Sequence, residues 1–203
     1  MAKRGTPDVR SRILDAALDL LAKHGFTELS QLKIAHAAGV RQSHLTYYFP
    51  TRTDLLEAVA VRSVQELLAS LRAGLISQSI PTADLPLIVG KMLADKRRAR
   101  VMLGLIVSSD EEREIKRFLR RFVAQVRIGI AGIARLLGHE PSATDVAAFH
   151  LLIVGATILN VARDDAASRR ECAEIARVAV SRFLVPETQR AGTKRRRRRK
   201  AAV

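Results

Sequence analysis

Apolar residues recur every three or four positions along most of this 203-residue chain. In the first such stretch, Ile13, Ala16, Ala17, Leu20 and Leu21 follow the i, i+3, i+4, i+7 pattern that places side chains on one helix face. The chain contains no Asn-Gly or Asp-Gly pair that would turn a β-hairpin, and its six prolines can all lie at or near the ends of elements. These features predict an all-α protein.

The periodic stretches and the breaks between them predict about nine helices. We expect them over residues 7–24, 31–38, 42–49, 52–75, 82–93, 95–107, 110–137, 146–162 and 168–184. A hydroxyl residue three positions before a carboxylate is typical of a capping box at a helix N-terminus. Pairs with this spacing include Thr51 with Asp54, Ser142 with Asp145, and Ser168 with Glu171.

The charge of the chain is strongly positive and unevenly distributed. It has 35 Lys and Arg against 20 Asp and Glu, for a formal net charge of +15 at pH 7. Seven of the positive charges form the run KRRRRRK at 194–200, which cannot pack and predicts a disordered basic tail over 186–203. The rest of the chain is still basic, which favours a polyanionic partner such as nucleic acid.

The sequence carries no pattern typical of an enzyme. Its five histidines and its single cysteine, Cys172, lack metal-ligand spacing, and there is no nucleophile elbow or phosphate-binding glycine loop. We therefore expect no catalytic residue, no metal and no cofactor. A single cysteine excludes an intramolecular disulfide and fits a reducing compartment. The N-terminus has no apolar segment of a secretory signal, so we expect a cytoplasmic protein.

The part of the sequence that is most informative about function is residues 32–49, LKIAHAAGVRQSHLTYYF. Its apolar residues are Ile34, Ala38, Val40 and Leu45, and Gly39 permits a tight turn with a positive φ. Two short helices around such a turn form a helix-turn-helix, whose second helix can enter the major groove of DNA. An ordinary helical corner has the same spacing, but this second helix is too polar for a buried corner.

At these residues the chain resembles the DNA-binding domain of the tetracycline-repressor (TetR) family of bacterial regulators. The resemblance rests on RSRILDAALDLLAKHGF, LKIAHAAGV and LTYYFPTRTDLLEAV, all within about the first 60 positions. It implies a three-helix helix-turn-helix head over 1–50, followed over 51–185 by a larger helical domain for effector binding and dimerisation. Two positions depart from the family pattern: Arg41 stands where a capping Ser or Thr is usual, and Thr46 where tyrosine is common.

Side-chain chemistry predicts how the second short helix would read DNA. Gln42 can make paired hydrogen bonds to adenine and Arg41 to guanine, while serine and threonine hydroxyls can contact base edges or phosphates. By the resemblance, the tyrosines and the arginine that follow touch the DNA backbone or pack beneath the helix. The predicted DNA-binding residues are Arg41, Gln42, Ser43, His44, Thr46, Tyr47, Tyr48 and Arg52.

The resemblance also implies a homodimer, formed through about 142–184, that reads an inverted-repeat operator. It further implies a cavity in the body for a small effector. The candidate lining residues are Met92, Met102, Leu105, Ile106, Phe118, Phe122, Phe149, His150 and Asn160. Met and Phe at helical spacing are more often core residues than cavity walls. An apolar lining with a few polar groups suits a hydrophobic effector.

Residues 146–162 are apolar nearly all round. This stretch is at the short limit for a membrane span, and His150, Thr157 and Asn160 interrupt it, so we expect a buried helix and no membrane partner. Its small residues would let helices cross closely in a dimer, but they would equally suit an ordinary core.

Two functions of different classes follow. The first is a ligand-responsive transcriptional regulator, chiefly a repressor, that binds double-stranded DNA as a homodimer and is released by a small effector. The alternative is a basic helical protein that binds nucleic acid or acidic surfaces without sequence preference through its Arg-rich tail.

Overall fold

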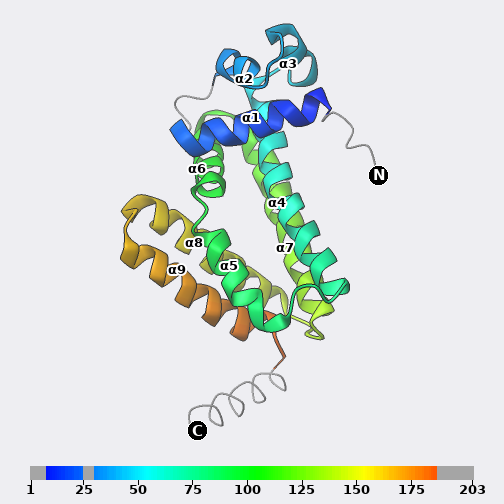
Figure 1. Cartoon of the computed structure of the whole chain (residues 1–203), viewed down its shortest axis with the longest axis vertical. Coiled ribbons are helices and arrows are strands. Elements are labelled where there is room, and N and C mark those ends of the chain that lie inside the picture. Colours follow the sequence, from blue (N-terminus) through cyan, green and yellow to red (C-terminus); the bar gives the residue numbers. More distant parts are fainter. Residues whose placement is uncertain (1–7, 25–29, 187–203) are drawn as a thin grey trace, which may run out of the picture. The chain divides into compact units, whose positions relative to one another are not determined.

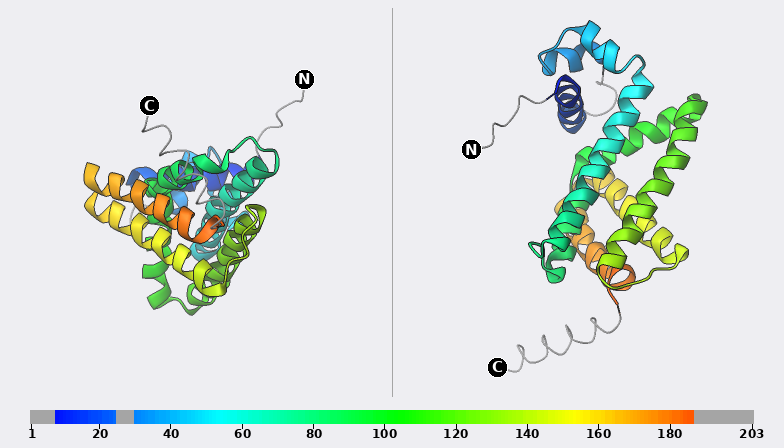
Figure 2. Two further views of the ribbon diagram at one scale, coloured as in Figure 1. Left: turned by 90° about the horizontal axis from the view of Figure 1, so that it is seen from below. Right: turned by 90° about the vertical axis from the view of Figure 1, so that its right-hand side faces the viewer.

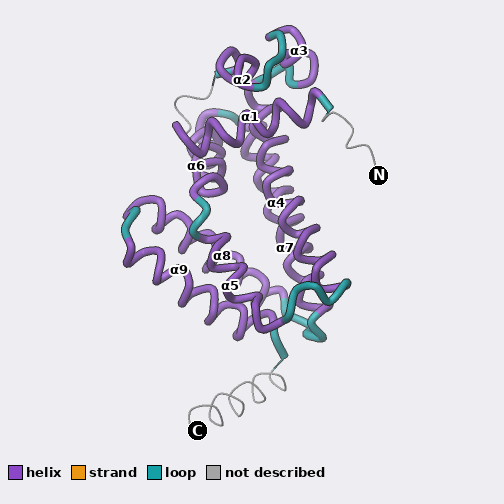
Figure 3. The backbone as a smooth tube through the Cα atoms, in the orientation of Figure 1, coloured by secondary structure: helices purple, strands orange, loops and turns teal. Residues whose placement is uncertain are grey.

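The computed structural model describes residues 8–24 and 30–186, and all regular secondary structure within these residues is helical (Figure 3). The prediction of an all-α protein is confirmed. The described α-helices are α1 (Val9–His24), α2 (Gln31–Ala37), α3 (Gln42–Tyr48), α4 (Arg52–Ile76), α5 (Leu85–Leu93), α6 (Lys96–Glu111), α7 (Arg113–Leu136), α8 (Ala143–Arg163) and α9 (Ala166–Ala179). A short 3-10 turn, Thr82–Asp84, precedes α5, and a π-helical turn, Val180–Leu184, follows α9.

The chain forms two compact units that are interleaved in sequence. The first unit contains Met1–Gln65 and Lys96–Phe122, and the second contains Glu66–Asp95 and Val123–Val203. Helices α4 and α7 therefore each contribute residues to both units. The division of function at residue 50 stays a prediction, and the predicted basic tail over 186–203 lies, apart from Pro186, outside the described residues.

In the first unit, α1 packs against α2, α3 and α6 (Figure 1). Of the predicted apolar stripe, Ile13, Ala16, Ala17 and Leu21 are buried and Leu20 is half-buried, and Leu14, which lies outside that stripe, is buried as well. Polar contacts reinforce this packing, because Arg62 on α4 pairs with Asp15 on α1 at 2.9 Å. The result is a small helical core that supports α2 and α3.

In the second unit, α5 and α8 both pack against α9, and α8 and α9 lie side by side as the yellow and orange helices of Figure 2. Gly90 allows the close approach of α5, since a Cβ added there would lie 3.4 Å from the Cα of Ala173 on α9. Buried polar groups fix the register of α8. Asn160 accepts a hydrogen bond from the Ser168 hydroxyl at 3.0 Å and donates one to the Leu93 carbonyl at 3.5 Å.

Two of the three predicted capping boxes are confirmed and one is wrong. Thr51 with Asp54 and Ser142 with Asp145 form reciprocal hydrogen bonds at the starts of α4 and α8. Ser168 does not cap α9. Asp165 is the N-cap of α9, and Ser168 occupies the N3 position of its capping box. The Ser168 backbone N–H donates a hydrogen bond to the Asp165 carboxylate at 2.5 Å.

Helix α8 is less covered within the single chain than the expectation of a buried helix implied. Leu151 is 66% exposed and Leu159 is 56% exposed. By length and composition α8 could cross a membrane, and among the described residues it is the single helix of which this is true. In its most apolar stretch, 22% is buried inside the protein. Within the single chain, α8 therefore exposes an apolar face.

Candidate nucleic-acid interface

The turn between α2 and α3 is built by local hydrogen bonds and one glycine. Ser30 caps α2 by accepting a hydrogen bond from the Lys33 backbone N–H at 3.3 Å. At the other end, Gly39 has a φ of 63°, as the sequence predicts, and the Val40 N–H donates to the Ala35 carbonyl at 3.0 Å. This turn redirects the chain within a few residues and presents α3 as a separate short helix.

Helix α3 is anchored by two apolar side chains and exposes the rest. Leu45 is fully buried and Phe49, just after the helix, is 2% exposed. All eight predicted DNA-binding residues are exposed: Arg41, Gln42, Ser43, His44, Thr46, Tyr47, Tyr48 and Arg52. Tyr47 is 79% exposed, an unusual exposure for a tyrosine in a monomer without a partner. The helix therefore has the geometry of a reading helix and not of a buried corner.

The two tyrosines support one another at the end of this helix. Their rings meet edge to face with centroids 5.3 Å apart, and Tyr48 is less exposed than Tyr47. Below them, the Arg10 guanidinium lies over the Phe49 ring, 5.5 Å from its centroid. The Tyr47 side chain is therefore exposed while its ring contacts Tyr48, and the buried Phe49 ring packs against the rest of the unit.

The unusual residue at the start of α3 leaves that end uncapped by a side chain. Arg41 is the N-cap, with extended backbone angles, and forms no side-chain capping hydrogen bond. The Thr46 hydroxyl donates to the Gln42 carbonyl at 2.9 Å, so its proton is used within the helix. Among the described residues, the side chains of Gln42, Ser43 and His44 form no hydrogen bond and are available to a partner.

The first turn of α4 follows α3 by a few residues and is held from two sides. Thr51 and Asp54 form its capping box, and the Thr53 hydroxyl contacts the Glu112 carboxylate at 2.5 Å. Arg52 is exposed between these contacts. Glu112 lies just before α7 and was not singled out by sequence reasoning, because nothing local marks an acid that pairs with a hydroxyl 59 positions away.

The predicted effector-lining residues are divided between the two units. Met102, Leu105, Ile106, Phe118 and Phe122 belong to the first, and Met92, Phe149, His150 and Asn160 to the second. Most are buried, whereas Ile106 is exposed and the two methionines are half-buried. The rings of Phe118 and Phe122 stack with centroids 5.3 Å apart. The role of this set in binding an effector stays a prediction.

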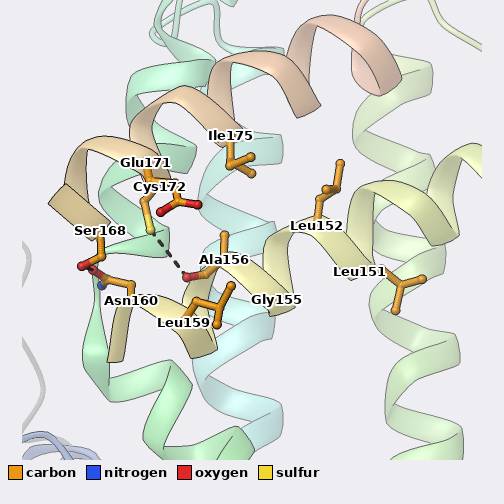
Figure 4. Close-up of a pocket in the computed structure, with 10 residues that line it drawn as sticks. All are labelled: Leu151, Leu152, Gly155, Ala156, Leu159, Asn160, Ser168, Glu171, Cys172 and Ile175. Atoms are coloured by element: carbon orange, nitrogen blue, oxygen red, sulfur yellow. Dashed lines mark hydrogen bonds between the residues drawn. The ribbon is translucent and has the colours of Figure 1, made fainter. Parts of the chain in front are cut away.

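A groove opens between α8 and α9 on the exposed side of the second unit (Figure 4). It has a volume of about 200 Å³, and apolar side chains from both helices dominate its lining. The lining residues are Leu151, Leu152, Gly155, Ala156, Leu159, Asn160, Ser168, Glu171, Cys172 and Ile175. At its floor the Cys172 thiol donates to the Ala156 carbonyl at 3.6 Å. Burial raises the pKa of this thiol, which makes it an unreactive packing residue.

In the described part of the chain, no group of three or more His, Cys, Asp or Glu side chains is placed to hold a metal ion. Helix α2, the turn after it and helix α3 together have the arrangement of a helix-turn-helix.

Comparison with known proteins identifies the family of this domain. Residues 13–59 match the family described as bacterial regulatory proteins, tetR family. Over 58 residues the chain is 50% identical to the HTH-type transcriptional repressor LfrR of Mycolicibacterium smegmatis, a match that spans 29% of each protein. Residues 13–59, which include α3, are therefore similar to the bacterial regulatory proteins of the TetR family, as the resemblance implied.

Solved structures extend the likeness to the fold of the whole chain. A transcriptional regulator from Saccharomonospora viridis, in complex with choline, is 18% identical with a TM-score of 0.66, covering 90% of this chain and 100% of that one. The regulator FadR from Bacillus subtilis, in complex with stearoyl-CoA, is 18% identical with a TM-score of 0.61, covering 84% and 97%. These relatives are regulators and not enzymes, in line with the expectation for this chain.

Proposed function

We propose that this protein is a ligand-responsive transcriptional regulator, acting chiefly as a repressor in the cytoplasm, that binds an inverted-repeat operator as a homodimer. The observation that carries the proposal is the exposed polar face of α3 above its two buried anchors, Leu45 and Phe49. Gln42 and Arg41 on that face can read base edges, and Tyr47 and Arg52 can hold the backbone. The 50% identity of this region to a repressor supports the same reading.

The homodimer is supported by the apolar face that α8 and α9 expose. Leu151, Leu152 and Leu159 are exposed there and line the groove between the helices. An apolar surface of this kind marks an interaction site, and a twofold axis would bring the same face of a second copy against it. Gly155, which has no neighbour within 4 Å of an added Cβ, leaves room for a close helix crossing.

A dimer also supplies the affinity that one reading helix lacks. A seven-residue helix offers few base contacts, whereas two copies related by a twofold axis read two half-sites of one operator. The predicted operator is therefore an inverted repeat whose half-sites are separated by a helical turn or a multiple of it.

Helix α6 is the element through which an effector would act on the first unit. Arg100 on α6 donates to the carbonyl of Leu21, in α1, at 3.2 Å, and Arg98 donates to the Ser63 carbonyl, in α4, at 3.3 Å. These bonds tie α6 to the helices that support α2 and α3. An effector that binds one arrangement of α6 more tightly shifts operator binding by that difference in affinity. The ligands named for the structurally similar regulators support an effector response.

The test is selection of bound sites from random DNA with the purified protein. We expect enrichment of an inverted repeat, loss of that sequence preference in Gln42→Ala, and weaker binding to all sites alike in Tyr47→Ala. Gln125→Ala, an exposed glutamine on α7, is the matched control and should select the same sites as the wild type. Enrichment of a single unpaired half-site, or equal preference in all variants, would contradict the proposal.

A further inference from the structure

The second unit holds an arginine and a histidine, Arg127 and His150, with which no carboxylate of the described residues pairs. Arg127 lies on α7 and His150 on α8, both within the second unit. The Nε of Arg127 is closed off from solvent and has no hydrogen-bond partner, and His150 is 8% exposed. Buried polar groups in folded proteins nearly always have partners, so an exception calls for an explanation.

Apolar residues flank both members of the pair along their helices. Ile130 on α7 and Phe149 on α8 belong to one hydrophobic cluster, and Val126 on α7 packs against it. Arg127 is half-buried, and a partly enclosed guanidinium group gains from a negative group that lies close to it.

The acids of α8, of α9 and of the turns beside them are engaged elsewhere. Asp145 and Asp165 cap helices, Asp164 pairs with Arg169, and Glu140, Glu171 and Glu174 pair with other exposed arginines. No Asp or Glu whose burial is described is buried, and no described carboxylate pairs with Arg127. A negative group at this place would therefore come from outside the described residues.

His150 adds a second donor of suitable chemistry. Burial, and after it the positive charge of Arg127, lowers the pKa of His150, so its ring is neutral at pH 7 and carries one N–H. Within the described residues no hydrogen bond occupies either ring nitrogen. A guanidinium and a neutral N–H donor together match the oxygens of a carboxylate.

We propose that Arg127 and His150 form the polar end of the effector site and bind a single oxyanion, so that the effector is an amphipathic carboxylate-type anion and not a lipophilic cation. This inference rests on the proposed effector response. The planar guanidinium holds a carboxylate through two parallel hydrogen bonds, while the cluster around it receives the apolar part. A cation placed there would be repelled by Arg127.

The fold alone does not determine whether the ligand is an anion or a cation. The similar regulator from Saccharomonospora viridis was solved with choline, a cation, and the one from Bacillus subtilis with stearoyl-CoA, an anion. The residues at this place decide between such ligands, and in this chain they are basic.

The experiment compares two series of probes with the same alkyl chains on the full-length protein: n-alkyl carboxylates from hexanoate to stearate, and the corresponding alkyltrimethylammonium ions. Binding is measured by calorimetry, and operator release is measured separately by fluorescence anisotropy of labelled operator DNA. We expect the carboxylates to bind and the ammonium ions not to bind. Stronger binding by the ammonium series, or no binding by either, would overturn the inference.

The Arg127→Met variant separates a binding role from a structural one. Loss of the charge-assisted hydrogen bonds should weaken carboxylate binding about ten- to a hundredfold. The Tm without ligand should stay the same or rise, because an unbalanced charge is replaced by an apolar side chain of similar length. His150→Phe should weaken binding by a smaller factor. Arg120→Met, an exposed position on the same helix, is the control and should bind like the wild type.

The two readouts distinguish the two proposals. If carboxylates bind through Arg127 but leave the operator occupied, the anion site stands and the proposed effector response fails. If the ammonium ions release the operator and carboxylates do not, the response stands and the anion site is wrong. Unchanged carboxylate affinity in Arg127→Met also overturns the anion site.

Discussion

A single residue, His150, ties the stability of the body to pH. Because burial lowers its pKa in the folded protein, the unfolded chain takes up the proton first as the pH falls below the ordinary value of about 6.5. The free energy of unfolding should therefore decrease on acidification, by at most about 1.4 kcal/mol per pH unit from this one proton.

We expect His150→Gln to flatten this dependence between about pH 7 and 5, where the buried histidine contributes its slope. Urea unfolding at a series of pH values measures it. His36→Gln on α2, where the histidine is exposed, is the matched control and should keep the wild-type slope. Equal slopes in the two variants would show that His150 is not the group responsible.

The capping of α9 shows what residue patterns can and cannot decide. Ser168 with Glu171 has capping-box spacing, but so does Asp165 with Ser168, one turn earlier. Asp164 ends α8 in a left-handed conformation, with a φ of 47°. Because α8 ends there, α9 begins directly after Asp165, and the earlier pair forms the capping box. Two overlapping boxes cannot be ranked from spacing alone, whereas the isolated boxes at Thr51 and Ser142 were predicted correctly.

At the scale of one element, α3 begins without a side-chain cap. Arg41→Ser supplies the missing acceptor and should stabilise the protein by about 1 kcal/mol in urea unfolding. The same change removes a cation from the reading face, so operator affinity should fall although stability rises. Arg72→Ser, an exposed arginine on α4, removes one positive charge without adding a cap and should change neither quantity markedly. A variant that gains both stability and affinity would show that Arg41 does not touch DNA.

Most helices could be predicted from periodicity, but the boundary between α6 and α7 could not. The sequence predicted helices over 95–107 and 110–137, with Ser108 and Ser109 in the break. Instead, α6 continues through both serines to Glu111, and Glu112 alone separates it from α7. The Glu112 carboxylate contacts Thr53, a tertiary contact that accompanies the break and has no local signature. No glycine or proline marks this position, so local rules place the break too early.

At the scale of the whole molecule, the exposed apolar face of α8 needs a partner. Replacing Leu151 and Leu159 with Glu places two charges where a second copy is proposed to pack, and should convert the homodimer to a monomer in size-exclusion chromatography with light scattering. Leu87→Glu, at a 60% exposed position on α5, is the control and should remain dimeric. A wild-type protein that is monomeric and partitions onto lipid vesicles would instead assign the face of α8 to a membrane.

The basic run at 194–200 decides between the two functions that the sequence left open. If the reading helix dominates, removing residues 194–203 should weaken binding to all DNA sequences alike and leave the preference for the operator intact. The slope of log K against log salt should fall by about 0.9 for each phosphate that the tail contacts on duplex DNA. Titration of operator and scrambled duplexes over a salt series measures both effects. Non-specific binding through the tail has the opposite consequence: truncation abolishes binding to both duplexes, and the intact protein does not distinguish them. The ratio of the two affinities, more than either affinity, therefore tells whether the seven charges at 194–200 or one short helix dominates DNA binding.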